Sequence, residues 1–178
     1  MRRTWMLGTT VVVVALVSAA AALAVKPKSG NWKGTTSQTF PNTTISGPCP
    51  LLSGGPAPVC FKVSSAGSTI VDFEPAFEGS CTKAGSPPKQ SPIITTDAGR
   101  NVPITNGKFH TSTTSARIHS GSVTLATASD QLHGKFTSKT KASGTYSVTF
   151  KFNNNAAKYG LAGYSCKTGT VSWTATAP

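Results

Sequence analysis

Apolar and polar residues alternate along most of the chain after residue 30, and this period of two predicts β-strands. The clearest case is residues 146–152, where Tyr, Val and Phe share one face and Ser, Thr and Lys share the other. The same alternation marks residues 132–136, where it leaves His133 on the polar face, and residues 171–175. Shorter β-branched or aromatic segments predict further strands at residues 59–64, 69–73, 77–82, 101–105, 108–111, 117–120 and 122–126.

Turn signals separate these segments, and no sustained helical period follows residue 30. Asn106-Gly107 is typical of a type I′ turn, because both central residues of that turn need positive φ. Residues 27–30 and 84–92 are expected to be loops, and residues 155–159 are the only helix candidate. The pattern predicts an all-β fold, a two-sheet antiparallel β-sandwich (Ig-like or jelly-roll-like), built from residues 31–178 as one domain after a linker at 25–30.

The first 24 residues have the composition of a secretory signal peptide. Arg2 and Arg3 precede an apolar run, and Ala22-Leu23-Ala24 matches an A-x-A cleavage site before Val25. The alternative is an uncleaved anchor, since the apolar residues 6–25 approach the roughly 20 needed to span a bilayer. Both alternatives predict an extracellular domain, which contacts the membrane only if the leader is kept.

The four cysteines are candidates for disulfides in that compartment, and they allow three connectivities. Cys49 and Cys60 enclose a Pro- and Gly-rich segment whose ends should lie close together. Cys81 and Cys166 both lie beside strand-like segments that are far apart in the sequence. We therefore expect the pairs Cys49–Cys60 and Cys81–Cys166, the first closing a loop at residues 41–60. This pairing leaves no thiol for catalysis or metal binding.

The charge balance is strongly basic. Without Arg2 and Arg3, 15 Lys and Arg face 5 acidic residues, a net charge of +10. Such a field favours anionic partners such as cell-wall polymers, acidic glycans or lipid head groups. The alternative is that scattered lysines only keep a Thr- and Ser-rich domain soluble. The export signal and the lack of a recognisable binding module argue against nucleic acid.

A pattern of aromatic, glycine and cysteine positions extends over most of residues 32–175. They are Trp32-x-Gly34-Thr35, Phe61, Phe73, Cys81, Gly107-x-Phe109, Gly134-x-Phe136, Gly144 and Cys166-x-x-Gly169-x-x-x-Trp173. This pattern resembles a group of secreted β-sandwich proteins of actinobacteria that have no assigned activity. The resemblance implies a fold and no reaction. The chain departs from the pattern at residues 39–60, where it carries an insertion with its own cysteine pair.

Candidate catalytic groups are few, and no cofactor is expected. The acids are Asp72, Glu74, Glu78, Asp97 and Asp130. A glycosidase needs two carboxylates facing each other across a cleft, and Asp72 with Glu74 is the only local pair. The sequence contains no G-x-S-x-G elbow, H-E-x-x-H motif, EF-hand loop or phosphate-binding loop.

The histidines are the remaining candidates for chemistry. If residues 108–111 and 117–120 form a hairpin, His110 and His119 face outward, opposite or diagonal to each other. Such a pair is a candidate site for zinc or copper, because imidazole is a ligand for both. The alternative is two polar residues on a solvated face.

Together these features predict a non-enzymatic secreted or cell-surface β-sandwich protein that binds an anionic or polysaccharide ligand of the cell envelope. One alternative is an extracellular hydrolase with an atypical site at Asp72, Glu74 or the histidines. Another is a purely structural envelope component.

Overall fold

The computed structural model describes residues 25–39, 49, 55–94 and 101–178. They form ten β-strands and one 3₁₀ turn, which confirms the predicted all-β fold. The strands are β1 (Gly30–Thr39), β2 (Pro56–Val63), β3 (Thr69–Lys83), β4 (Ser86–Ile94), β5 (Asn101–Pro103), β6 (Lys108–Ser120), β7 (Val123–Ser138), β8 (Lys141–Phe152), β9 (Ser165–Lys167) and β10 (Val171–Thr176). The 3₁₀ turn, η1 (Asn154–Tyr159), lies where the sequence predicts a short helical turn.

The strands form one antiparallel sheet that closes on itself, and the prediction of two separate packed sheets is not confirmed. β10 pairs with β1 along one edge and with β8 along the other. β9 pairs in the same way with both β3 and β8. These four pairings, with β1–β2 and β2–β3, close six strands into a barrel. β6 and β7 extend the sheet beyond β8, and β4 and β5 each pair with β3.

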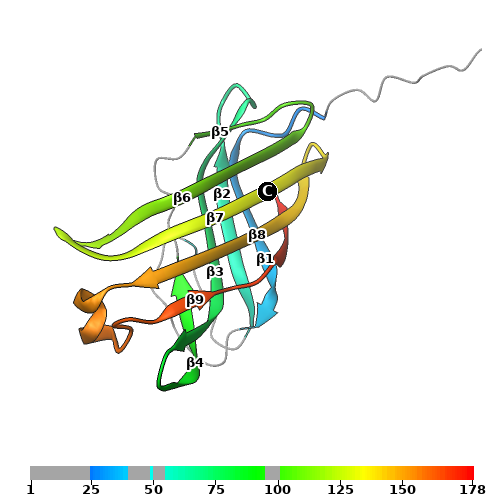
Figure 1. The fold of residues 1–178 in the computed structure, drawn as a ribbon. Helices are drawn as coiled ribbons and strands as arrows, with labels where there is room; N and C mark the ends of the chain where they lie inside the picture. The colour runs from blue at the N-terminus through cyan, green and yellow to red at the C-terminus, as the bar shows by residue number, and fades with distance from the viewer. Residues whose placement is uncertain (1–24, 40–48, 50–54, 95–100) are drawn as a thin grey trace, which may run out of the picture.

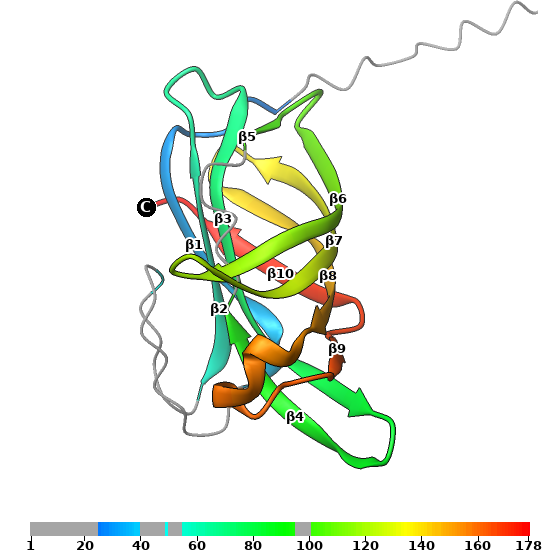
Figure 2. The same cartoon turned by 60° about the vertical axis from the view of Figure 1, so that its left-hand side comes forward.

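Figure 1 shows β6, β7 and β8 running side by side across the front of the molecule, with β1, β2 and β3 behind them in a different direction. In Figure 2 the β3–β4 hairpin extends from the end of the molecule that also carries η1 and β9. The arrangement leaves one broad sheet face, made mainly by β6, β7 and β8, on the outside.

Several predicted strands are parts of longer ones. β3, β6 and β7 each join two predicted segments into one strand of 13 to 16 residues. Most of the residues between those segments pair with a neighbouring strand, which a local sequence pattern does not reveal. Asn106 and Gly107 have φ values of 52° and 68°, as a type I′ turn requires, so this turn is confirmed.

The prediction of a loop at residues 84–92 is wrong for most of its length, since Ser86–Ile94 is strand β4. The prolines at 87, 88 and 92 argue against a central strand because proline lacks the N–H that a ladder needs. β4 pairs only with β3 among the described residues, and such an edge position tolerates proline. Likewise, the last five residues of the predicted loop at 41–60 belong to β2, whereas residues 41–48 and 50–54 lie outside the described residues.

The inner faces of the strands meet in an aromatic core. Phe61 lies at its centre, with ring centroids 5.5–6.3 Å from those of Trp32, Phe73, Phe109 and Trp173. All five rings are nearly or fully buried. Aromatic pairs of this kind contribute about 0.5–1.5 kcal/mol each beyond the area that they bury. The core is therefore filled by side chains, and the outward faces carry the polar groups.

The segment expected as a linker lies against the domain. Val25 packs on the core, and Pro27 is buried. The Lys28 amide donates to the carbonyl of Lys139 (2.8 Å), and its Nζ donates to the carbonyl of Pro178. This segment thus contacts both the β7–β8 turn and the C-terminus.

Candidate functional site

A groove crosses the outer face of β6, β7, β8 and β10 and encloses about 510 Å³. Its floor is a row of four residues that pair directly from strand to strand: Phe109, Gly134, Gly144 and Trp173. The two aromatic side chains at the ends of the row point into the core, and the two central residues have no side chain. We call this feature the glycine groove.

The two glycines are required by close packing on the inner side of the sheet. A Cβ at Gly134 would lie 2.1 Å from the Phe109 ring. A Cβ at Gly144 would lie 2.0 Å from the His133 carbonyl oxygen and 2.5 Å from the Trp173 ring. The rings therefore fill the space that side chains at 134 and 144 would take, which also fixes the position of the groove floor.

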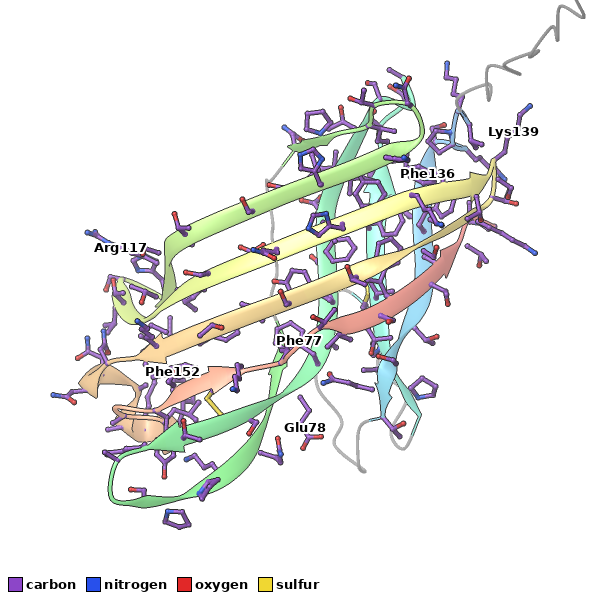
Figure 3. The ribbon with its side chains drawn as sticks, turned by 45° about the vertical axis from the view of Figure 1, so that its right-hand side comes forward. Phe77, Glu78, Arg117, Phe136, Lys139 and Phe152 are labelled. Carbon is purple, nitrogen blue, oxygen red and sulfur yellow. A yellow bond between two sulfur atoms is a disulfide. The ribbon has the colours of Figure 1, made fainter. Side chains whose placement is uncertain are left out.

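Two rows of outward-facing side chains form the walls of the glycine groove, one on each side of the floor. One row contains Lys108, Lys135, Ser143 and Thr174, paired in that order across the four strands. The other contains His110, His133, Thr145 and Ser172 in the same order. The β6–β7 end of the groove is thus basic, and the β8–β10 end carries hydroxyl groups. Figure 3 shows this face with its side chains, between Arg117 at one end of the sheet and Lys139 at the other.

The basic end brings like charges together. Lys108 and Lys135 are direct cross-strand partners, an arrangement that destabilises a sheet unless an anion lies between the charges. Among the residues that the structure describes, none that lines the groove is acidic. Asp130, on β7, is buried. The other acidic residues that the structure describes lie on β3, away from the groove. The local field therefore favours an anionic ligand.

The predicted pairing of His110 with His119 is wrong. Both residues lie on β6, which continues through residues 112–116 with a register shift and a positive φ of 57° at Ser115. His119 lies far along β6, where its Nδ1 is 3.4 Å from the Thr124 hydroxyl. His110 pairs instead with His133, and the two rings stack with centroids 6.2 Å apart and an interplanar angle of 14°.

The candidate carboxylates meet in a second concavity of about 240 Å³ on the outer face of β1, β2 and β3. Asp72 and Glu74 both line it, beside Lys33 and Lys62. Glu74 is only 8% exposed, and its burial, followed by the nearby Asp72 carboxylate, raises its pKa above the usual value. Asp72 has a positive φ of 53° at an irregularity in the β2–β3 pairing. The structure thus brings the one predicted carboxylate pair together.

Both predicted disulfides are present. Cys49 is bonded to Cys60, and Cys81 is bonded to Cys166 across the β3–β9 pair. Cys49, Cys60 and Glu74 have ligand-type atoms within 4.8 Å of one another. Because the two sulfurs are bonded to each other, neither is a thiolate, and the group lacks the anionic sulfur that metal ions bind. The expectation that the cysteines serve structure fits this geometry.

Comparisons with models of protein families, with curated proteins and with solved structures found no match to this chain. Among the described residues, no helix has the length and apolar character required to cross a bilayer.

Sequence reasoning missed most of the groove. In the sequence, Gly134 and Gly144 are only positions of the pattern described above, and the lysines are only scattered charges. Two strands each carry a glycine among their inward-facing residues, and each glycine is flanked by polar residues, as in His133-Gly134-Lys135 and Ser143-Gly144-Thr145. These two tripeptides are the sequence signal that locates the groove. It becomes readable only when the register that pairs Gly134 with Gly144 is known.

Proposed function

We propose that this protein is a non-enzymatic, secreted or cell-surface β-protein that binds an anionic polysaccharide of the cell envelope in the glycine groove. The observation that carries the proposal is the paired array of Lys108 and Lys135 with the hydroxyl residues at the other end of the same groove. The leader sequence and the two disulfides support an extracellular location.

The chemistry of the walls matches a charged sugar polymer. Lysine ammonium groups attract carboxylate, sulfate or phosphate groups, and hydroxyls both donate and accept hydrogen bonds. Ser143 and Thr145 are half-buried, whereas Ser172 and Thr174 are exposed, so the hydroxyls line the groove at two depths. A nucleic acid is a poorer match, because the aromatic rings of the floor point into the core and offer no surface for base stacking.

Binding to purified cell wall and to a soluble acidic polysaccharide tests the proposal. We expect the double variant K108A/K135A to lose at least tenfold in affinity at low salt, because it removes the two cationic groups of the array. Raising the salt concentration should weaken the binding of the wild-type protein, since exposed charges are screened within about 10 Å at 0.1 M.

K151A/K167A is the matched control. Lys151 and Lys167 are exposed lysines on the same outer face, paired with Ser165 and Thr149, away from the groove. Their removal changes the net charge by the same amount and should leave most of the affinity intact. Equal losses in the two double variants would mean that binding follows net charge alone, and the proposed site would be wrong.

A second candidate is an extracellular hydrolase that uses Asp72 and Glu74. It is favoured by their shared concavity and by the raised pKa of Glu74, which is a property of catalytic acids. A screen of glycan and ester substrates with the wild-type protein and E74Q separates the two functions. Turnover that E74Q abolishes would establish the hydrolase.

A further inference from the structure

We propose that His110 and His133 together bind a divalent transition-metal ion, copper in preference to zinc. This site goes beyond polysaccharide binding and does not depend on it. It differs from the His110–His119 pair that the sequence suggests, because the strand register brings a different histidine opposite His110.

The two histidine side chains are placed so that each can supply one nitrogen ligand to the same ion. His110 and His133 are direct partners on antiparallel strands, where opposite Cβ atoms lie about 4.5–5.5 Å apart. Their rings are nearly parallel, with centroids 6.2 Å apart. A nitrogen–metal bond is about 2.0–2.1 Å long, so one nitrogen from each ring must come within about 4 Å of the other. Both side chains are exposed at the groove wall, so they have room for the small rotations that this requires.

The donor set determines the choice of metal. Two neutral imidazoles suit copper and zinc, and affinity at a given nitrogen site is higher for Cu²⁺ than for Zn²⁺. The described lining residues include no carboxylate that would favour calcium or magnesium, which prefer oxygen ligands. The remaining coordination positions face solvent and are open to water.

The two lysines give the metal site a distinctive salt dependence. Lys108 and Lys135 form the opposite wall of the groove, across its floor, and repel a cation. Salt screens this repulsion, so metal affinity should rise with ionic strength. Polysaccharide affinity should fall over the same range, so the two activities are separable on one protein sample.

The test uses the full-length, untagged protein that has been stripped of metal. Zn²⁺ is titrated by calorimetry, and Cu²⁺ by electron paramagnetic resonance. We expect one ion per chain and hyperfine coupling to two imidazole nitrogens for copper. H110A and H133A should each weaken binding at least tenfold and leave at most one coupled ring nitrogen.

H119A is the matched control, because His119 is an exposed histidine of the same strand with a different cross-strand partner. It should bind both metals as the wild-type protein does, and circular dichroism should show that all three variants are folded. Absence of binding below millimolar metal, or an equal loss in H119A, would overturn the proposal. K108A/K135A should bind metal at least as tightly as the wild-type protein, even if it no longer binds polysaccharide. A loss of metal binding in that variant would also count against the site.

Discussion

Glu74 is a residue whose ionised side chain destabilises the folded state. Its carboxyl group is buried on β3, with one oxygen 3.7 Å from the sulfur of Cys60 and with Asp72 nearby. A disulfide sulfur carries no hydrogen and cannot donate a hydrogen bond to a carboxylate. Burial, together with the neighbouring Asp72 carboxylate, favours the protonated acid, which agrees with the raised pKa of Glu74.

We therefore expect E74Q to be more stable than the wild-type protein at pH 7. A raised pKa means that the folded state binds the proton more tightly than the unfolded chain does, so ionised Glu74 destabilises the fold. This cost is absent below the unfolded pKa of about 4.3, grows as the pH rises, and is complete above the folded pKa. Urea unfolding of both proteins at pH 3.5 and pH 7 measures it.

The stability gain of E74Q should disappear at the lower pH. E78Q is the matched control for the loss of one acidic charge, since Glu78 lies on the same strand. If E78Q raised the stability at pH 7 as much as E74Q does, the effect would not come from the burial of Glu74.

The sequence predicted single residues well where the chemistry is local. Asn106 and Gly107 form the expected turn because their own backbone preferences determine it. The two disulfides are the expected ones because the spacing of the cysteines along the chain favours these pairs. The histidine pair could not be predicted, because the partner of His110 depends on the register of β6 against β7 over their whole length.

At the scale of elements, the shortest strand of the barrel joins two longer strands. β9 has three residues and pairs with β3 on one side and β8 on the other. Cys166, at its centre, is fully buried and bonded to the equally buried Cys81. The sequence indicated the cysteine but not the strand, because three residues are too few to show alternation.

Removal of this bridge should cost more stability than removal of the other. In the chain-entropy model, the separation of 85 residues between Cys81 and Cys166 corresponds to about 4.6 kcal/mol, and the separation of 11 between Cys49 and Cys60 to about 2.8 kcal/mol. We expect C81A/C166A to lose more free energy of unfolding than C49A/C60A, as measured in urea. The loss of buried sulfur packing in the core adds to the difference.

C49A/C60A is the comparison that makes this prediction specific, because it also removes one disulfide and two sulfur atoms. A larger loss in C49A/C60A would show that the 49–60 bridge contributes more to the folded state than loop length indicates.

At the scale of the whole molecule, barrel closure explains why the predicted sandwich was not confirmed. Alternating strands with one buried face fit both a pair of sheets and a closed sheet. The difference lies in β10, which hydrogen-bonds to β1 and to β8, strands at opposite ends of the sequence. Such long-range pairing leaves no local mark in the sequence, so the class of fold was predictable and its closure was not.

The net charge of the whole molecule gives a last prediction, which is independent of any ligand. Residues 25–178 carry a net charge of +10, so like charges repel across the folded surface. Salt screens this repulsion, and we expect Tm to rise by a few degrees when NaCl increases from 10 to 150 mM. In a domain of this size, a shift of about 2–4 °C corresponds to about 1 kcal/mol. K151A/K167A, with a net charge lower by two, should show a smaller rise in calorimetry. A Tm that falls with salt in both proteins would mean that attractive charge pairs outweigh the repulsion. The excess of lysine would then not destabilise the fold, and binding of an anion would not be expected to relieve any repulsion.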